Sequence, residues 1–153
     1  LNALAGRASL LTECKTPPIL TPHPGEMARL EVDATTQSVN TDRIGTARRF
    51  ARERGVFVVL KGARTVIARP DGLVAISPTG NPGMATAGTG DVLTGMIVGL
   101  LAQRVPAWEA ACAATYFHGS AGDLASQHFG QPGMLAGDLI AQIPYALQRT
   151  TTA

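Results

Sequence analysis

Apolar and polar residues follow one another along the chain in patterns that predict helices and strands in turn. Residues 40–55 read NTDRIGTARRFARERG, which predicts an amphipathic helix because the apolar positions recur at helical spacing. Those positions are Ile44, Ala47, Phe50 and Ala51. Thr41 or Asp42 suits the start of this helix, and Gly55 suits its end.

Short apolar runs rich in β-branched residues predict strands on both sides of this helix. Residues 19–21 form a first short strand, which runs into a loop where prolines exclude a helix. Residues 56–62, VFVVLKG, predict a buried strand. Residues 64–77, RTVIARPDGLVAIS, predict two strands, because Asp71 and Gly72 between them favour a tight turn.

The second half of the chain predicts three helices. Residues 92–104 are apolar on almost every side, so we expect a buried helix there. Pro106 suits the first position of a second helix that runs to Phe129, and residues 136–149 form a third helix, which Pro144 kinks or shortens. Strands that precede helices indicate an α/β fold with a partly parallel sheet, whose ligands gather at the carboxyl ends of the strands.

The composition is that of a folded globular protein. The 153 residues suffice for one domain with a sizeable core, and a hydrophobic content of 45% excludes a disordered chain. The formal net charge of +2 is too small to indicate a nucleic-acid partner. No membrane span is expected, because the longest apolar run falls short of roughly 18 residues. Cys14 and Cys112 lack metal-ligand spacing, which favours free thiols in a reducing cytoplasm.

Arginines concentrate in the helix predicted at residues 40–55. They are Arg43, Arg48, Arg49, Arg52 and Arg54. Charge clusters of this kind more often form a solvated helix face than a binding patch, and we interpret this cluster in that way.

A glycine-rich segment directly precedes the first of the three C-terminal helices. Residues 81–91 read NPGMATAGTGD. The unpaired amides and positive dipole end of a helix start attract anions, and glycines let a ligand approach the backbone closely. The segment therefore suits a phosphate group, with Thr86 and Thr89 as further hydroxyl donors. It lacks the GKS or GKT of a P-loop and the GxGxxG of a dinucleotide site, so neither is indicated.

Asp91 closes this segment and allows two interpretations. A negative side chain at a helix start is itself stabilising, typically by ~0.3–1 kcal/mol, so Asp91 can be a simple N-cap. Alternatively, Asp91 faces the reacting group as a general base while the amides hold phosphate oxygens. The residues alone do not separate these two interpretations.

Four segments resemble, in the same order, the ADP/ATP-dependent NAD(P)H-hydrate dehydratases, a family of the ribokinase-like superfamily. They read TPHPGEMARL, VVLKGARTVIARPDG, NPGMATAGTGDVLTGMIVGLLAQ and GDLI, and they cover residues 21–140. The resemblance implies a ribokinase-like layered α/β/α fold with a partly parallel sheet, a β-hairpin and C-terminal helices. It also implies dehydration of the S epimer of NADHX or NADPHX, with ADP converted to AMP or ATP used instead, and Mg²⁺ as the accompanying ion.

The resemblance also implies residue roles where the motifs match. Asp91 matches the acid of the GTGD motif, which contacts the hydrated substrate and serves as the catalytic base. Thr89 and Gly90 match nucleotide contacts in the anion hole, and the KGART segment matches the part that binds AMP. The KGART residues are Lys61, Gly62, Ala63, Arg64 and Thr65. His23 in TPHPGE matches a substrate contact, although a single histidine in a proline loop is more often structural when the residues alone are considered.

The remaining polar candidates carry less functional signal. Glu26 shares the TPHPGE motif, and a binding role and a helix-start role both stay open for it. His118 and His128 lie on a predicted helix without metal-type partners, so we interpret both as packing or surface residues and predict no protein metal site. Asp138 in GDLI suits a helix cap.

The beginning of the chain departs from the family pattern. Complete members carry an N-terminal half with several strands, a GPGLG-like loop and further substrate contacts, none of which this sequence contains. We therefore expect residues 1–153 to form one partial domain, the C-terminal, nucleotide-binding half, and we expect a homo-oligomer. Two alternative functions stay open: a small-molecule kinase of the same superfamily, and a truncated nucleotide-binding module without turnover.

Overall fold

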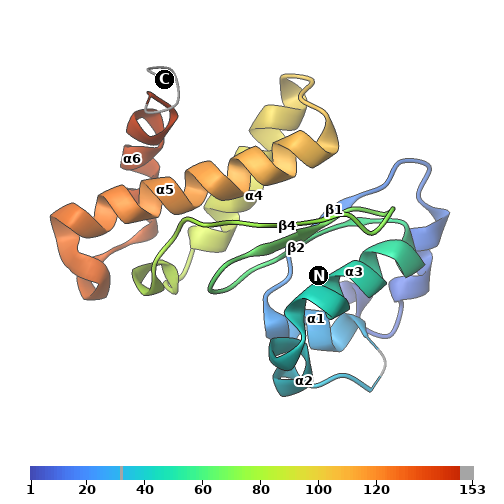
Figure 1. Cartoon of the computed structure of the whole chain (residues 1–153). Coiled ribbons are helices and arrows are strands. Elements are labelled where there is room, and N and C mark those ends of the chain that lie inside the picture. The colour runs from blue at the N-terminus through green and yellow to red at the C-terminus, as the bar shows by residue number, and fades with distance from the viewer. Residues whose placement is uncertain (32, 149–153) are drawn as a thin grey trace. The chain divides into compact units, whose positions relative to one another are not determined.

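The protein divides into two compact units in its computed structural model, Leu1–Ile76 and Ser77–Ala153. The structure describes residues 1–31 and 33–148. Figure 1 shows that the first unit combines a sheet with helices, whereas the second unit is built from helices. The chain is therefore mixed α/β, as predicted, and the expectation that residues 1–153 form a single partial domain stays a prediction.

A four-stranded sheet lies at the core of the first unit, with the strands in the order β1-β2-β3-β4. The strands are β1 (Ile19–Leu20), β2 (Phe57–Leu60), β3 (Val66–Ala68) and β4 (Val74–Ile76). β1 pairs with β2 in parallel, with Ile19 opposite Phe57, whereas β2, β3 and β4 pair in antiparallel fashion. The partly parallel sheet and the hairpin are thus confirmed, and Gly72 in the hairpin turn has the positive φ of 92° that suits glycine.

Three α-helices cover one face of this sheet (Figure 1). They are α1 (Pro24–Leu30), α2 (Thr36–Thr41) and α3 (Arg43–Arg54), and two 3₁₀ helices precede the sheet, η1 (Asn2–Leu4) and η2 (Ala8–Glu13). Met27 of α1, Phe50 of α3 and Leu60 of β2 belong to one core cluster and are at most 1% exposed. Burial of each such side chain contributes about 1.5–3 kcal/mol, which holds the helices on the sheet.

The helix predicted at residues 40–55 is α3, and it begins directly after Asp42, one of the two residues expected at its start. The turn before it, up to Thr41, belongs to α2. Asp42 caps α3, since its Oδ1 accepts a hydrogen bond from the Gly45 amide at 2.8 Å. Gly55 ends the helix in the left-handed conformation, with φ of 65°. Three of the four predicted inner positions are buried, but Ile44 is 40% exposed, so its assignment to the inner face was wrong.

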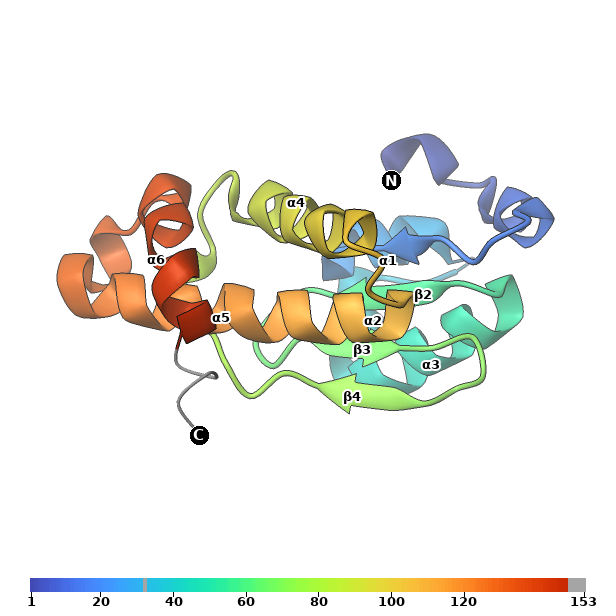
Figure 2. The same ribbon diagram turned by 90° about the horizontal axis from the view of Figure 1, so that it is seen from above.

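The second unit contains η3 (Pro82–Met84), α4 (Thr89–Ala102), α5 (Ala107–Gly133) and α6 (Ala136–Gln148). α5 is the longest of these helices; α4 lies alongside it and α6 crosses its C-terminal part (Figure 2). A non-helical residue, Gly130, interrupts α5 close to its predicted end at Phe129. α6 runs past Pro144 to Gln148, so the proline does not shorten it there, and the predicted last residue, Arg149, lies outside the described residues.

α4 is not buried on all sides, contrary to the prediction. Leu93 and Ile97, one turn apart, are buried, but Val98 is 57% exposed and Leu101 is 38% exposed. Within the second unit α4 packs on α5 and α6. No helix among the described residues is long and apolar enough to cross a membrane.

Candidate functional site

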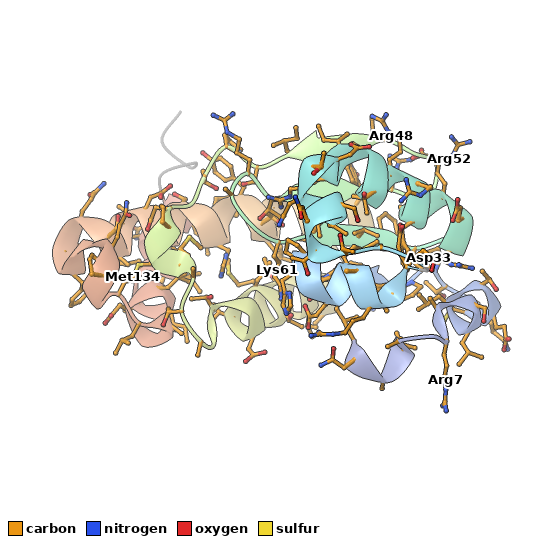
Figure 3. The ribbon with its side chains drawn as sticks, turned by 90° about the horizontal axis from the view of Figure 1, so that it is seen from below. Arg7, Asp33, Arg48, Arg52, Lys61 and Met134 are labelled. Carbon is orange, nitrogen blue, oxygen red and sulfur yellow. The ribbon has the colours of Figure 1, made fainter. Side chains whose placement is uncertain are left out.

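The carboxyl ends of β1 and β2 bring two predicted site residues together in the first unit. The amide of Lys61, which follows β2, donates a hydrogen bond of 2.8 Å to the carbonyl of Pro22, which follows β1. This bond holds the TPHPGE loop against the KGART loop. The Glu26 Oε2 atom then lies 3.6 Å from His23 Nε2 and 3.7 Å from Lys61 Nζ, and Figure 3 shows Lys61 beside α1.

His23 caps α1 with its imidazole ring. Its Nδ1 accepts hydrogen bonds from the amides of Gly25 at 3.1 Å and Glu26 at 3.2 Å, while Glu26 Oε2 accepts one from the His23 amide at 2.8 Å. This arrangement is a capping box, with histidine where Ser, Thr, Asp or Asn is usual. Because Nδ1 is the acceptor, the ring proton lies on Nε2, which the 52% exposed side chain presents as a donor.

Glu26 carries a charge that is stabilised on several sides. Burial raises the pKa of Glu26, but the hydrogen bond from the His23 amide and the nearby charge of Lys61 lower it by more, so the net shift is downward. The geometry supports the helix-start role that the sequence left open. It adds an ion pair with Lys61, which places the ammonium group at the edge of the KGART loop.

Arg43 holds the KGART loop from the side of α3. Its Nη1 donates to the Ala63 carbonyl at 2.8 Å, and its Nη2 donates to the carbonyls of Leu60 at 2.8 Å and Lys61 at 3.1 Å. Burial lowers the pKa of Arg43. Gly62, with φ of 139°, makes room for the guanidinium, because a Cβ there would lie 2.8 Å from Nη1.

The interpretation of the arginine cluster as a solvated face was therefore wrong for Arg43. It holds for Arg48 and Arg52, which are exposed and point outward from α3 in Figure 3. Arg49 forms a 2.7 Å ion pair with Glu31. No local pattern distinguishes Arg43 from its neighbours, because its partners lie 17 to 20 residues further along the chain.

The backbone amides of the KGART loop are available to a ligand. Among residues 1–31 and 33–148, the amides of Gly62, Ala63 and Arg64 find no backbone acceptor. Arg64 adopts the left-handed conformation with φ of 55°. Successive unpaired amides around a left-handed residue make a concavity that attracts anions. The Thr65 hydroxyl donates to the Gly62 carbonyl at 3.2 Å and thus serves the loop itself.

In the second unit, the glycine-rich segment closes on the start of α4. Gly88, with φ of 90°, is the N-cap residue. The Thr89 side chain is buried, and its hydroxyl lies 2.8 Å from the Met84 carbonyl and 2.9 Å from the Thr86 carbonyl. The hydroxyl of Thr89, expected to be a donor to a ligand, is thus bound to the loop. A ligand can meet Thr89 through its backbone amide.

The amides of Thr89 and Gly90 are the unpaired donors of this helix start. The amides of Asp91 and Val92 both donate to the Gly88 carbonyl at 3.1 Å. For the two preceding amides, Thr89 and Gly90, the described part of the chain provides no backbone acceptor. Together with the positive end of the helix dipole they form an anion site.

Asp91 lies in the third position of α4 and is not its N-cap. Its side chain is exposed, and it forms no hydrogen bond or ion pair with the residues that the structure describes. The capping interpretation therefore loses its geometric basis, because Gly88 occupies the cap position. A carboxylate one residue after the unpaired Gly90 amide is placed to act on a group that the amides hold.

Two residues of α5 that the sequence did not single out as site residues hold this loop. Asp123 accepts a hydrogen bond from the Gly80 amide at Oδ2 and one from Asn81 Nδ2 at Oδ1, both at 2.9 Å. His118, which is 8% exposed, lies with Nε2 2.8 Å from the Thr89 carbonyl. The packing interpretation is thus confirmed for His118, but with a specific polar partner.

The remaining candidates keep structural roles. Asp138 accepts a hydrogen bond from the Leu135 amide at 2.9 Å, as expected of a residue at a helix start, and His128 is exposed. Within residues 1–31 and 33–148, no group of three or more His, Cys, Asp or Glu side chains could hold a metal ion.

The predicted site residues therefore fall into two groups. The first unit joins His23, Lys61 and the rest of the KGART loop around Glu26, and the second unit places Thr89, Gly90 and Asp91 in the first turn of α4. Each group is defined by contacts inside its own unit.

Comparison with known sequences identifies the family of the chain. A family model described as NAD(P)H-hydrate dehydratase matches residues 1–145. The bifunctional NAD(P)H-hydrate repair enzyme Nnr of Moorella thermoacetica is 54% identical over 148 residues, which are 97% of this chain and 28% of that enzyme. The ADP-dependent (S)-NAD(P)H-hydrate dehydratase of Neisseria meningitidis is 43% identical over 152 residues, which are 99% of this chain and 51% of that enzyme. The chain thus spans about half or less of the length of these relatives.

Solved structures agree with the sequence relatives. The ADP/ATP-dependent NAD(P)H-hydrate dehydratase from Bacillus subtilis, co-crystallized with ATP and Mg²⁺, matches with a TM-score of 0.83 and 38% identity over 87% of this chain and 48% of that one. A ribokinase-like superfamily protein from Enterococcus faecalis matches with a TM-score of 0.70 and 30% identity over 92% of this chain and 50% of that one. The predicted ribokinase-like fold is confirmed for this part, and the chain belongs to the NAD(P)H-hydrate dehydratase family.

Proposed function

We propose that the chain provides the nucleotide-binding half of an ADP-dependent (S)-NAD(P)H-hydrate dehydratase. The reaction returns NADHX and NADPHX to NADH and NADPH, with ADP converted to AMP. The observation that carries the proposal is the first turn of α4, where the unpaired amides of Thr89 and Gly90 directly precede the unpaired carboxylate of Asp91. An anion hole next to a base is the arrangement that phosphoryl transfer to a hydroxyl requires.

The nucleotide is assigned to two sets of donors. Lys61 and the amides of Gly62, Ala63 and Arg64, with Thr65 beside them, receive the AMP portion, because the loop presents unpaired amides next to an ammonium group. Thr89 and Gly90 receive the phosphoryl group that is transferred, through their backbone amides. Mg²⁺, which neutralises phosphate charge, accompanies the nucleotide.

Asp91 is the base in this proposal. Its carboxylate takes the proton of the ring hydroxyl of the hydrated nicotinamide, and the hydroxyl oxygen attacks the β-phosphorus of ADP. The bond from that phosphorus to the bridging oxygen breaks, which releases AMP. Phosphate then leaves the ring carbon with the bonding electron pair, and loss of a proton from the neighbouring carbon forms the double bond. Phosphate leaves far more readily than hydroxide, which is the chemical reason for using a nucleotide in a dehydration.

His23 contacts the substrate in this scheme. Its Nε2 is a hydrogen-bond donor because Nδ1 is occupied by the helix amides. Such a donor suits an oxygen of the hydrated substrate. The protein acts in the cytoplasm and as a homo-oligomer in this proposal, as the sequence led us to expect.

The test is regeneration of NADH from enzymatically prepared NADHX. The protein receives NADHX with ADP or with ATP, the absorbance of NADH is followed, and AMP or ADP release is measured by chromatography. We expect NADH and AMP to appear in equal amounts with ADP. Folded protein that regenerates no NADH with either nucleotide contradicts the dehydratase proposal.

The same samples separate the alternatives. A stable phosphorylated substrate in the mass spectrum, with no NADH, indicates a small-molecule kinase. Binding of ADP by calorimetry without any product indicates a nucleotide-binding module without turnover.

A further inference from the structure

His118 contacts the peptide group that joins the two donors of the anion site. Its Nε2 lies 2.8 Å from the Thr89 carbonyl oxygen. A carbonyl oxygen offers only lone pairs, so the ring nitrogen must carry the proton and donate. The carbonyl of Thr89 and the amide of Gly90 belong to the same planar peptide group. The hydrogen bond from His118 therefore acts on the Gly90 N–H across a single peptide.

This contact has two physical effects on the Gly90 amide. A peptide group that accepts a hydrogen bond at its oxygen becomes a stronger donor at its nitrogen, since hydrogen bonds in series polarise one another. The bond also fixes the plane of the peptide and hence the direction of its N–H. The imidazole of His118 is 8% exposed, so water competes little with it.

Close contacts beside His118 hold α5 against the glycine-rich loop. Gly119 and Gly122, on the same helix, lie so close to Thr79 and Met84 that a Cβ at either glycine would overlap these side chains. Asp123 holds the beginning of the loop through its bonds to Gly80 and Asn81. The loop thus lies directly on α5, and His118 contacts its far end, at the anion site.

We infer that His118 is a positioning residue for the proposed phosphoryl transfer, which orients and polarises the Gly90 amide that binds the transferred phosphoryl group. The inference rests on the proposed function and adds to it a residue that touches neither substrate nor nucleotide. In a regular helix the Thr89 carbonyl also accepts from the amide four residues later, so loss of His118 leaves no unpaired carbonyl behind. The main effect of removing the donor should therefore fall on the reaction.

The test compares His118→Phe, His118→Gln and His128→Gln with the unaltered protein. Phenylalanine keeps the ring but removes the donor, and glutamine restores an N–H near the position of Nε2. We expect His118→Phe to lower kcat about tenfold, the worth of one hydrogen bond that strengthens in the transition state, with KM for ADP changed less than threefold. His118→Gln should recover kcat to within about threefold, and His128→Gln, on an exposed part of the same helix, should leave kcat unchanged.

Binding measurements keep this test independent of turnover. AMP lacks the phosphoryl group that the Gly90 amide binds, so His118→Phe should weaken ADP binding by up to about threefold and leave AMP binding unchanged in calorimetry. A parallel loss for both nucleotides, or a kcat that glutamine does not restore, indicates a merely structural histidine and overturns the inference. Absence of NADH formation in the unaltered protein refutes the proposed function but not the role of His118. In that case the ratio of ADP to AMP affinities in His118→Phe and in the unaltered protein tests whether His118 positions the Gly90 amide.

Discussion

At the scale of single residues, His23 and Glu26 show how one short motif serves the fold and the site together. The ring of His23 caps α1 through Nδ1, which leaves Nε2 as the donor of the ring. Glu26 completes the capping box and pairs with Lys61, so the same carboxylate stabilises the helix start and places an ammonium group at the KGART loop. A substitution at either residue is expected to change stability as well as binding.

For Glu26 we predict a pH-dependent loss of stability. Its folded pKa lies below the ordinary 4.5, so its charge stabilises the folded protein above about that pH and ceases to do so as the pH falls through the folded pKa. Glu26→Ala should lower the free energy of unfolding at pH 7 by about 1 kcal/mol, the worth of a helix cap. Glu26→Gln should cost less, because it keeps the hydrogen bond to the His23 amide.

Chemical denaturation at several pH values checks this prediction. The difference between the unaltered protein and Glu26→Ala should shrink below about pH 4.5, where the carboxylate becomes protonated. A difference that stays constant from neutral to acidic pH would show that the charge of Glu26 contributes nothing.

For Asp91 we predict a loss of reaction without a loss of fold. Asp91→Asn should reduce NADH formation at least a hundredfold, since a positioned general base contributes about 10²–10⁴-fold. Nucleotide affinity should stay within a few-fold, and the free energy of unfolding should fall by no more than about 1 kcal/mol, the effect of a charge near a helix start. Turnover, calorimetry and denaturation are measured on the same preparation.

Asp138→Asn provides the matched control for Asp91. Asp138 also lies in the first turn of a helix, but its carboxylate is bound to the Leu135 amide. The control should affect stability and leave the rate of NADH formation unchanged. An Asp91→Asn protein that retains turnover, or that loses several kcal/mol of stability, would restore the purely structural interpretation of Asp91.

At the scale of elements, α3 supports the KGART loop rather than only covering the sheet. Its first residue, Arg43, binds the carbonyl oxygen of Leu60 at the end of β2 and two carbonyl oxygens of the loop, those of Lys61 and Ala63. The loop thereby acquires a defined shape without regular secondary structure of its own. Gly62 permits this because the guanidinium occupies the space of a side chain.

For this contact we predict that Arg43→Met weakens AMP binding about tenfold or more and lowers the free energy of unfolding by about 1.5–3 kcal/mol, the range for hydrogen bonds to a charged group. Arg43→Lys should rescue only in part, because an ammonium group cannot reproduce the planar fork of donors. Calorimetry and denaturation provide the two readouts. Arg48→Met, at an exposed position of α3, is the control and should change neither; equal effects at both positions would refute the role of Arg43.

At the scale of the whole molecule, we predict that adenine nucleotides stabilise the chain against unfolding. A ligand that binds only the folded state at a concentration one hundred times its Kd raises the free energy of unfolding by about 2.7 kcal/mol. Thermal unfolding with ADP, AMP and, as a control, free adenosine checks this. Protein that melts at the same temperature with and without ADP and AMP would show that neither set of amides forms a nucleotide site.

The sequence predicted most elements because their signals are local. Short apolar runs rich in β-branched residues located the strands, the Asp71-Gly72 turn located the hairpin, and Asp42 and Gly55 located the ends of α3. α2 was not predicted. The burial of Ile44 and the burial of α4 on all sides were predicted wrongly, because periodicity shows which face of a helix is apolar and not what packs against it. The predicted site residues of the second unit lie in one helix start, whereas those of the first unit come from two loops that meet only in the folded unit, where Lys61 pairs with Glu26.

What the sequence by itself determined is therefore the family, the order of strands and helices, and the loops that carry the amides and acids of the site. Each of these depends on residues close together in the chain, where spacing and residue type report the conformation directly. Only the tertiary structure revealed Arg43, His118 and Asp123 as supports of those loops, because their hydrogen bonds join residues 17 to 43 positions apart. Such contacts form when folded elements pack, and no pattern within a single helix predicts them.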